Sequence, residues 1–417
     1  MYPPSFCVFG GPPLKILHII TRLIVGGAQE NTLLTCEGLH AHGHDVTLLT
    51  GPSPGPEGSL MDRANNGGYK VLVSPHLVRS PHPTHDLAAY NEIKKLVATT
   101  NPDIVHTHSS KAGILGRAAA WHVQQKTRNS KPETRNSPRI LHTIHGLPFH
   151  PYQNPLARKL WISLERYAAN RCDKIISVAD AMTRQALAAN IGRPELFTTI
   201  YSAMEVEPFL HPGTTRDEVR AKLNIPPTAF VFGTIARLQP LKGHDDLLAY
   251  ADQLFEKVPN AHLLWIGDGI FRTRFEQLLK EKKREGWQQR VTLTGLVPPT
   301  EVPRLLPAMD ALVHPSYREG LARALPQALL AGIPIISYDC DGAAEVCIPG
   351  KTGILVKTGD AKTLTSAMIG LAQNPTAATL MGATGRQFAL TRFRASTMVD
   401  QIESLYKSLL PNPESKL

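Results

Sequence analysis

The chain has 417 residues, of which 42% are apolar, and a formal net charge of +10. That length is sufficient for two domains with separate cores, and the basic balance is compatible with a phosphorylated substrate, an anionic membrane surface or a nucleic acid. Its five cysteines are dispersed and show no CxxC spacing. This argues against a disulfide framework or a zinc site and is typical of a reducing cytoplasm.

The N-terminal part of the chain predicts a strand, a glycine turn and a helix. Residues 1–13 are expected to be a loose leader, because they lack the charged start and long apolar core of a signal peptide. A buried strand over 14–20 (LKILHII) is followed by Gly26 and Gly27 and then a helix to about residue 42. Such a turn allows close approach of a diphosphate, although the two glycines alone also fit a simple tight turn.

This opening is not a dinucleotide-binding fingerprint. The turn lacks GxGxxG, and the next strand, 45–50, ends without the acidic residue that would bind a nicotinamide dinucleotide ribose. A dehydrogenase is therefore disfavoured.

Strands and helices continue to alternate along the first half of the chain. The strand-like runs are residues 69–74, 103–106, 139–143, 174–178 and 197–201. The helical stretches are residues 85–99, 113–123, 155–171 and 181–190. This alternation predicts a parallel sheet covered on both faces, with functional residues at the carboxyl ends of its strands.

Two of these strand ends are rich in polar groups. His108, Ser109 and Lys111 follow one strand, and His145 follows the next. Histidine can donate to a hydroxyl or a phosphate oxygen near neutral pH, but a single histidine in such a place is also often structural. Between the two strands, the polar and basic residues 126–138 predict a mobile loop.

A second alternating series follows an expected linker at residues 206–217. Its strands are predicted at 230–235, 262–266, 291–294, 311–313, 333–337 and 353–356. Its helices are predicted at 245–257, 272–285, 301–307 and 361–372, and an amphipathic helix closes the chain at about 391–410.

Charged residues stand at two strand ends of this second series. Arg237 and Lys242 lie five residues apart before a predicted helix and would suit a diphosphate, although loop cations are also commonly solvated. Glu319 stands in the turn before a helix that begins near Arg323, and Gln327 follows eight positions later, about two helical turns on. Without further context, Glu319 could equally be a capping carboxylate and Gln327 a surface residue.

The stretch from His314 to Gly332 resembles the donor-site signature of the family 4 glycosyltransferases. In that signature a Glu, usually followed by Gly, precedes a second Glu by eight positions; here the pair is Glu319 and Gln327. Gln can still hydrogen-bond a ribose hydroxyl, but it is neutral. The resemblance covers residues 14–409 and extends to Arg237–Gly243 and to the His145–Gly146 pair.

The resemblance implies the GT-B fold, in which two Rossmann-like, doubly wound parallel-sheet domains face a cleft. The first domain would span residues 14–205, the second 218–390, and the C-terminal helix at 391–410 would cross back to the first. His145 and Glu319 are the implied catalytic residues beside the transferred sugar. The implied donor-binding residues are Gly26, Gly27, Arg237, Lys242, Leu296, Gly320, Leu321, Ala322 and Gln327. His108, Ser109 and Lys111 fall in the implied acceptor loop, whereas Glu345 has no assigned role.

The implied reaction is retaining transfer from a nucleotide-diphosphate sugar, such as a UDP- or GDP-sugar, to a saccharide or lipid-linked acceptor in cell-surface polysaccharide or glycolipid synthesis. No cofactor or metal is expected, because no Asp-x-Asp dyad of the metal-using type is apparent. The expected location is the cytoplasm, with peripheral contact to an anionic inner membrane face compatible with the positive charge.

Three alternatives remain at this point. The first two are a GT-B phosphorylase and a sugar-nucleotide epimerase, of which the epimerase would act on the nucleotide sugar alone, without an acceptor. The third is a degenerate, non-catalytic nucleotide-sugar-binding protein, which Gln327 favours. A nucleic-acid binder is disfavoured, because the chain contains only 6% aromatic residues and no recognised binding motif.

Overall fold

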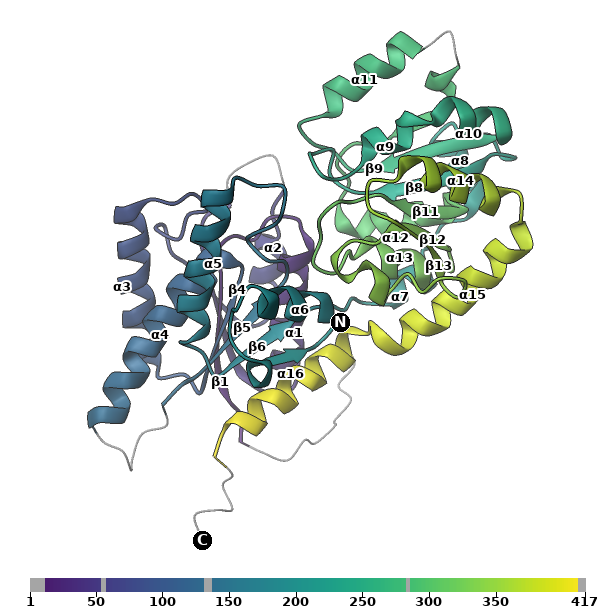
Figure 1. The fold of residues 1–417 in the computed structure, drawn as a ribbon. Helices are drawn as coiled ribbons and strands as arrows, with labels where there is room; N and C mark the ends of the chain where they lie inside the picture. Colours follow the sequence, from purple (N-terminus) through teal and green to yellow (C-terminus); the bar gives the residue numbers. More distant parts are fainter. Residues whose placement is uncertain (1–11, 54–57, 131–136, 283–285, 412–417) are drawn as a thin grey trace. The chain divides into compact units, whose positions relative to one another are not determined.

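The computed structural model describes residues 12–53, 58–130, 137–282 and 286–411, and it divides the chain into two compact units. Unit 1 comprises residues 1–204 and 395–417, and unit 2 comprises residues 205–394. Most of the expected leader, residues 1–11, and the middle of the expected loop, residues 131–136, lie outside the described residues. Figure 1 shows the elements of the two units.

Unit 1 is built on a seven-stranded, wholly parallel sheet with the order β3-β2-β1-β4-β5-β6-β7. Its strands are β1 (Lys15–Ile20), β2 (Asp45–Thr50), β3 (Lys70–Val73), β4 (Ile104–His108), β5 (Arg139–Ile144), β6 (Lys174–Ser177) and β7 (Phe197–Thr199). Side chains of β1 alternate between two cores: Ile16 and Ile20 enter one, and Leu17 and Ile19 enter the other. Both faces of the sheet are therefore buried, as its apolar strands predict.

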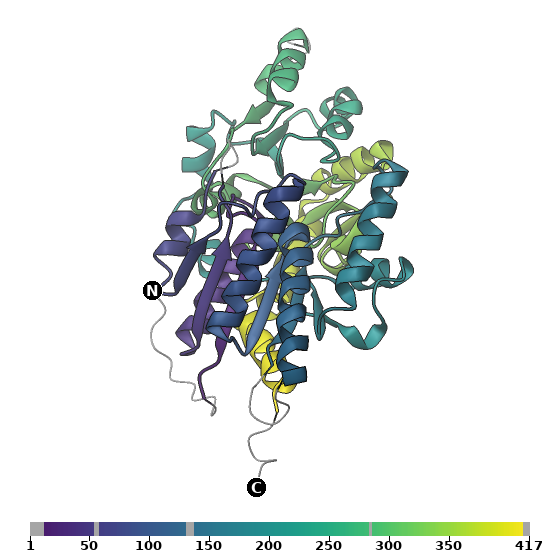
Figure 2. The same ribbon diagram turned by 90° about the vertical axis from the view of Figure 1, so that its left-hand side faces the viewer.

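Different helices cover the two faces of this sheet. The helices of unit 1 are α1 (Gly27–Ala41), α2 (Met61–Asn65), α3 (Pro83–Thr100), α4 (Ser110–Ser130), α5 (Pro155–Ala169), α6 (Asp180–Ala188) and α16 (Ala395–Leu409). Helices α1 and α16 pack together on the face of Ile16, whereas α3 and α4 lie side by side on the face of Leu17 (Figure 2). The C-terminal helix therefore belongs to the core of unit 1.

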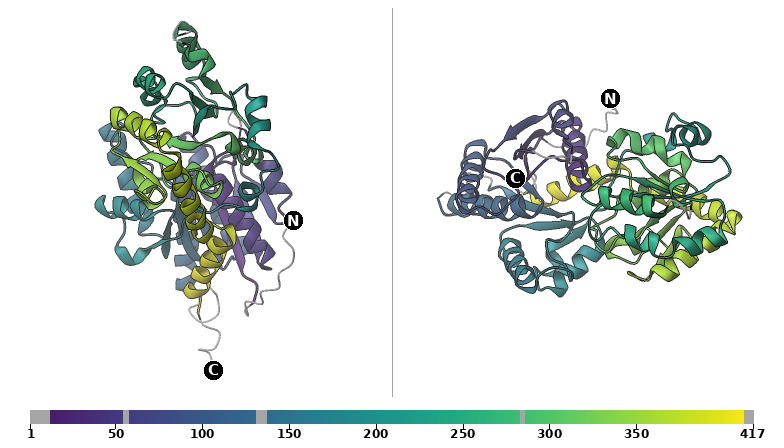
Figure 3. Two further views of the ribbon diagram at one scale, coloured as in Figure 1. Left: turned by 90° about the vertical axis from the view of Figure 1, so that its right-hand side faces the viewer. Right: turned by 90° about the horizontal axis from the view of Figure 1, so that it is seen from above.

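Unit 2 repeats this plan with a six-stranded parallel sheet in the order β10-β9-β8-β11-β12-β13. Its strands are β8 (Phe230–Ile235), β9 (Ala261–Ile266), β10 (Val291–Leu293), β11 (Ala311–His314), β12 (Ile335–Tyr338) and β13 (Gly353–Val356). Its helices are α7 (Glu207–Leu210), α8 (Arg216–Lys222), α9 (His244–Ala249), α10 (Ala251–Lys257), α11 (Arg272–Glu281), α12 (Val302–Leu305), α13 (Ala324–Leu330), α14 (Ala361–Ala372) and α15 (Pro375–Arg392). The long helix α15 packs against α13 (Figure 3). The predicted pair of doubly wound parallel sheets is confirmed.

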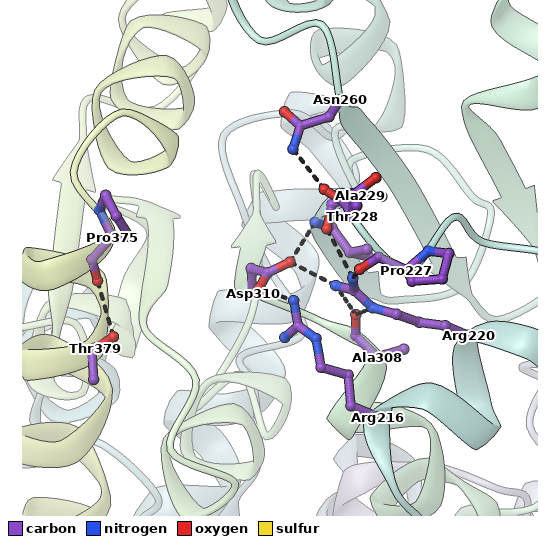
Figure 4. A network of polar contacts seen from close by, with 11 residues as sticks. Arg216, Arg220, Pro227, Thr228, Ala229, Asn260, Ala308, Asp310, Pro375 and Thr379 are labelled. Atoms are coloured by element: carbon purple, nitrogen blue, oxygen red, sulfur yellow. Dashed lines mark hydrogen bonds and ion pairs between the residues drawn. The ribbon is translucent and has the colours of Figure 1, made fainter.

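An ion-pair network centred on Asp310 lies at the amino ends of β8 and β11 (Figure 4). Asp310 accepts hydrogen bonds from Arg216 at 2.7 Å, from Arg220 at 2.8 Å and from the Val231 N–H at 2.7 Å. Arg220 is 1% exposed and also donates to the carbonyls of Ala308, Pro227 and Ala229. Because every guanidinium nitrogen of Arg220 donates within unit 2, this network holds α8 against the sheet at the edge opposite to the carboxyl ends of the strands.

The local structure differs from the expectation in three places. Residues 126–130 belong to α4, where the Thr127 hydroxyl donates to the Val123 carbonyl one turn earlier at 3.0 Å. The expected linker contains α7 and the start of α8, which is held by a Thr215–Glu218 capping box visible in the sequence as T-x-x-E. The single helix expected at 245–257 is interrupted at Tyr250.

Besides α7 and α8, two further helices were not predicted from the sequence. Helix α15 was missed although Asn374 caps it and Pro375 occupies its first position, both ordinary start signals. The short helix α2 was also missed.

Within the described ranges, no helix has the length and apolar character needed to cross a membrane.

Candidate active site

The order of strands in unit 2 reverses between β8 and β11. In an open parallel sheet, ligands bind outside the carboxyl ends of the strands at such a switch point, because the two outgoing loops diverge there. The loop after β8 carries Lys242, and the loop after β11 carries Glu319. The strand order thus brings together two residues that are 77 positions apart in the chain.

The two loops are tied to each other through their backbones. The Tyr317 N–H donates to the Leu241 carbonyl at 2.9 Å, and the Ser316 hydroxyl donates to the same carbonyl at 3.2 Å. Leu241 has a φ of 65° and Gly243 a φ of 71°, both in the left-handed region. A Cβ at position 243 would lie 1.9 Å from the Pro315 carbonyl oxygen, so the close approach of the loops requires glycine there.

Lys242, His314 and Glu319 form a partly buried polar cluster at this switch point. The Lys242 ammonium lies 2.5 Å from Glu319 Oε1, and His314 Nε2 lies 3.2 Å from the same oxygen. The side chains of Lys242 and Glu319 are 18% and 20% exposed. From the backbone, the Glu319 N–H donates to the Asp341 carboxylate at 2.6 Å.

This environment keeps the Glu319 carboxylate ionised. Burial by itself would raise its pKa, but the charge of Lys242 and the hydrogen bond from His314 outweigh burial and hold the pKa of Glu319 well below the usual carboxyl value. An ionised carboxylate accepts only, so His314 Nε2 donates to it. The cluster therefore presents a fixed carboxylate and an ammonium with further donors at one point.

The other cationic and loop residues proposed for donor binding lie at the same edge of this sheet. Arg237 follows β8 by two residues, in a loop held by the Leu238 N–H donating to the Asp268 carbonyl at 3.0 Å. Leu296 follows β10 and is 52% exposed. Because all these strands are parallel, Arg237, Lys242, Leu296 and Glu319 share the carboxyl edge.

The residues after Glu319 are mostly buried. Gly320, Leu321 and Ala322 line the interior of the loop, and the Gly320 carbonyl accepts from the Gly342 N–H at 3.1 Å. Gln327 lies on α13, is partly exposed, and its side chain has no hydrogen-bond partner among the described residues. Its amide is thus available to a ligand.

Sequence reasoning assigned no role to two residues that the fold places against Glu319. His314 is the last residue of β11, and its place at a carboxyl strand end was the available signal. Asp341 lies 22 positions after Glu319 and has a φ of 52°, which nothing in the local sequence indicates. Asp246, which accepts from Tyr317 and Tyr338 at 2.7 and 2.5 Å, was also missed.

In unit 1, the glycine turn precedes α1 as predicted, but Gly26 needs no glycine-specific backbone. Its φ of 178° is extended backbone, and an added Cβ would meet only the flexible end of Gln29 at 2.8 Å. Gly27 is the first residue of α1. The expected close approach of a diphosphate to Gly26 and Gly27 stays a prediction.

The predicted acceptor loop after β4 is occupied by contacts within unit 1. His108 is 1% exposed. Ser109 bonds to the Thr21 hydroxyl at 2.7 Å, and the Lys111 ammonium lies 2.5 Å from Asp86 and donates to the Ser80 carbonyl. His145 is partly exposed in the loop after β5 and lies 3.1 Å from His108, joined through ring nitrogens.

Two protein-family models match the chain along consecutive ranges. The model for Glycosyltransferase Family 4 matches residues 25–207, and the model for Glycosyl transferases group 1 matches residues 215–388. The first range lies in unit 1 apart from its last residues, and the second lies entirely in unit 2.

Curated relatives match over nearly the whole chain. An Escherichia coli UDP-Gal:alpha-D-GlcNAc-diphosphoundecaprenol alpha-1,3-galactosyltransferase is 24% identical, across 96% of this chain and 98% of the relative. A GDP-mannose-dependent alpha-(1-6)-phosphatidylinositol monomannoside mannosyltransferase of Mycolicibacterium smegmatis is 23% identical, across 85% and 88%.

Solved structures share the fold. HepE of Anabaena, crystallised with UDP and glucose, superposes with a TM-score of 0.77 at 19% identity, across 95% of this chain and 100% of that chain. WaaG, a glycosyltransferase involved in lipopolysaccharide biosynthesis, superposes with a TM-score of 0.70 at 16% identity, across 94% and 99%. With its two Rossmann-like units and matches to both family models, the chain has the GT-B fold and belongs to the family 4 glycosyltransferases, which are enzymes of the hexosyltransferase type.

Proposed function

We propose that the protein is a retaining glycosyltransferase that moves a hexose from a UDP- or GDP-sugar to a saccharide carried on a lipid diphosphate or another glycolipid. The single observation that carries the proposal is the Lys242–Glu319 pair at the switch point of unit 2. Lysine has three donors, so Lys242 can contact a phosphate oxygen while it remains paired with Glu319. The relatives that act on lipid-linked acceptors support the choice of acceptor.

The proposed chemistry is charge stabilisation at the leaving group. The bond between the anomeric carbon and the diphosphate oxygen breaks, and a bond to the acceptor hydroxyl oxygen forms on the same face of the sugar. Negative charge then develops on the diphosphate, beside Arg237 and Lys242, and the hydroxyl proton leaves with the nucleotide diphosphate. Glu319 and His145 would contact the transferred sugar, while Gln327 would bind a ribose hydroxyl and the loop of Leu296 the base.

Nucleotide binding is tested by thermal unfolding with UDP, GDP, ADP and CDP. A ligand at a hundred times its dissociation constant adds about 2.7 kcal/mol of stability, which gives a measurable shift. We expect UDP or GDP to stabilise the chain, and the matching monophosphate, which lacks the group held by Arg237 and Lys242, to stabilise it much less. Stabilisation by no nucleotide, in the native chain or in Gln327→Glu, would reject the donor site.

Turnover separates transfer from the alternative reactions. Release of UDP or GDP from UDP-galactose, UDP-glucose and GDP-mannose is measured with and without a synthetic diphosphate-lipid-linked N-acetylglucosamine. Transfer requires nucleotide release that depends on the acceptor. Conversion of the sugar nucleotide without an acceptor would instead indicate an epimerase, and binding without any turnover would indicate a degenerate site.

We further propose that α5 contacts an anionic membrane surface at the cytoplasmic side. Leu156 and Leu160, one turn apart on this helix, are 76% and 59% exposed, and Lys159 lies on the same face. Exposed leucines beside basic residues are typical of helices that lie in the interface of an anionic bilayer.

Vesicle flotation tests this contact. We expect the chain to float with vesicles that contain phosphatidylglycerol and not with pure phosphatidylcholine, and Leu156→Glu/Leu160→Glu to abolish flotation. Leu380→Glu is the matched control, because Leu380 is 67% exposed on α15. Equal loss in both variants would argue against a specific role of α5.

A further inference from the structure

Three histidines of unit 1 lie between the end of β3 and the first turn of α3. The segment from His76 to His85 reads HLVRSPHPTH, in which the histidines are spaced as H-x5-H-x2-H. His82 is the N-cap of α3, and His85 is the third residue of that helix. All three are exposed or partly exposed, so packing in the core does not explain their presence.

The rings of His76 and His85 direct their Nδ1 atoms toward each other. These two nitrogens are 3.3 Å apart. The separation is longer than the usual range of about 2.7–3.2 Å for an N–H hydrogen bond to oxygen. It matches two ligands on one tetrahedral zinc ion, because two bonds of about 2.0 Å at the tetrahedral angle place their nitrogens about 3.3 Å apart. The pair is therefore already spaced to hold an ion.

A carboxylate lies beside the other ring nitrogen of His76. Glu92 Oε1 is 3.5 Å from His76 Nε2, and Glu92 Oε2 accepts a hydrogen bond from the Ser74 hydroxyl. A metal-binding histidine usually directs its second nitrogen to a carboxylate or carbonyl, which keeps the proton there and leaves the first nitrogen with a lone pair. Glu92 lies about two turns after His85 on α3, so one helix carries both the second ligand and the group that orients the first.

His82 offers a third nitrogen. Its ring lies edge-on to the ring of His85, with centroids 4.6 Å apart. His82 Nδ1 bonds to the Thr84 hydroxyl at 3.0 Å, whereas His82 Nε2 has no hydrogen-bond partner among the described residues. Because His82 is exposed, a rotation of its side chain can turn Nε2 toward an ion without displacing core residues.

The backbone that carries these histidines is fixed at several points. Leu77 is fully buried in the core that α3 and α4 cover. The His82 N–H donates to the Asp86 carboxylate at 3.2 Å. Lys111, from the predicted acceptor loop, pairs with Asp86 and donates to the Ser80 carbonyl. The segment is thus held in place from both of its ends and from the neighbouring loop.

We propose that His76, His82 and His85 bind one divalent transition-metal ion of the zinc class, with Glu92 as the residue that orients His76. Imidazole nitrogens suit zinc, nickel and copper, whereas calcium and magnesium prefer oxygen ligands. Three histidines leave a fourth position on the ion for water or another oxygen ligand. The lack of an Asp-x-Asp dyad, from which no metal was expected, does not bear on histidine ligands. The ion would join the end of β3 to α3 and so brace the segment that Lys111 contacts.

A second cluster of possible ligands in unit 1 is less suitable. Ligand atoms of His42, Asp400 and Glu403 lie within 4.8 Å of one another. However, Glu403 already pairs with the Lys407 ammonium and with His42 Nδ1 at 2.6 Å. An ion there would have to replace both contacts and would be repelled by the charge of Lys407.

A buried cluster is excluded on similar grounds. Ring nitrogens of His18, His106 and His108 also lie within 4.8 Å of one another. His106 bonds through one nitrogen to the Tyr406 hydroxyl at 2.5 Å and through the other to the Thr143 hydroxyl at 2.7 Å. Both nitrogens of His106 are therefore already used.

Metal binding is measured on the full chain without an affinity tag and without any nucleotide. The chain is stripped with a chelator, loaded with zinc chloride and passed through gel filtration, and its zinc content is then determined. We expect one zinc per chain, loss of the zinc in His76→Ala and in His85→Ala, and retention in His122→Ala, which removes an exposed histidine of α4. Zinc that is lost in His42→Ala but kept in His85→Ala would overturn the proposal, and so would a native chain from which gel filtration removes the zinc.

Two further readouts report coordination itself. X-ray absorption at the zinc edge should show three nitrogen ligands at about 2.0 Å, and one fewer in His82→Ala. Glu92→Gln, which keeps the shape of the side chain, should weaken zinc binding by about tenfold while the chain stays folded. Unchanged coordination in His82→Ala together with unchanged affinity in Glu92→Gln would refute the site.

Amide hydrogen exchange tests the bracing of the segment. Zinc should slow the exchange of residues 74–86 in the native chain and in His122→Ala, and leave it unchanged in His85→Ala. Equal slowing in all three chains would contradict binding by His85. No nucleotide sugar enters these experiments, so their failure would leave the proposed function standing, and failure of the nucleotide tests would leave this site standing.

Discussion

Replacement of Lys242 by Met should destabilise unit 2 by about 2 kcal/mol near neutral pH. Loss of one partner of an exposed ion pair costs about 0–1 kcal/mol, and loss of one partner of a fully buried pair costs about 3–5 kcal/mol. Lys242 and Glu319 are each about four-fifths buried, and Glu319 would keep its hydrogen bond from His314, so an intermediate value is expected. A second change, Glu319→Gln, should recover about half of the loss, because it removes the unpaired charge.

The sign of the pH dependence follows from the low pKa of Glu319. Since the pKa is lower in the folded chain than in the unfolded chain, the stabilisation is full above the usual carboxyl pKa of about 4.3 and is lost as the pH falls through the folded value. The difference between the native chain and Lys242→Met should therefore be constant from about pH 7 to about pH 4.3 and shrink as the pH falls below about 4.3.

Urea unfolding followed by tryptophan fluorescence measures this effect in unit 2. Trp265 and Trp287 are buried in unit 2, so Trp121→Phe and Trp161→Phe in unit 1 leave a signal from unit 2 alone. Lys257→Met is the control, since Lys257 pairs with Glu256 at 3.2 Å on an exposed surface. A loss no larger than in this control, or one independent of pH, would refute the reasoning.

Two further perturbations test other parts of the structure. Gly243→Ala should lower the free energy of unfolding by several kcal/mol, because it adds left-handed strain of about 1–2 kcal/mol and a clash with Pro315. Gly350→Ala, at a φ of 72° with open space around it, is the control and should show the strain alone. Equal effects of the two changes in thermal unfolding would contradict the close approach of the loops. Glu403→Gln should destabilise unit 1 by about 2 kcal/mol near neutral pH, because buried Glu403 accepts from Lys407 and from His42 at 2.6 Å. Burial would raise the pKa of Glu403, but these bonds outweigh burial and lower it. The difference in unfolding free energy between the native chain and Glu403→Gln should therefore shrink as the pH falls below the usual carboxyl pKa. A difference that stays constant with pH would count against an ionised Glu403.

Local patterns in the sequence predicted most elements of both units. The strand at Asp45–Thr50 and the helix at Ala361–Ala372 were predicted with their observed bounds, because short apolar runs and a helical repeat are properties of neighbouring residues. The errors have two causes. Residues 126–130 are polar, which is typical of a loop, yet they continue α4. The start signals of α8 and α15 are present in the sequence but were overlooked. The charged residues Lys242 and Glu319 were also proposed as donor-site residues from the sequence, by their places at strand ends and by the family resemblance.

What the sequence by itself determined is the alternation of strands and helices, and with it which residues stand at carboxyl strand ends. Which strands become neighbours was decided only by the tertiary structure, because pairing depends on contacts between segments far apart in the chain. The pairing of β8 with β11 brings His314 and Glu319 to Lys242, and the folding of the loop after β12 adds Asp341. The pairing of β1 with β4 and of β4 with β5 places His18, His108 and His145 in line, where burial keeps the first two neutral.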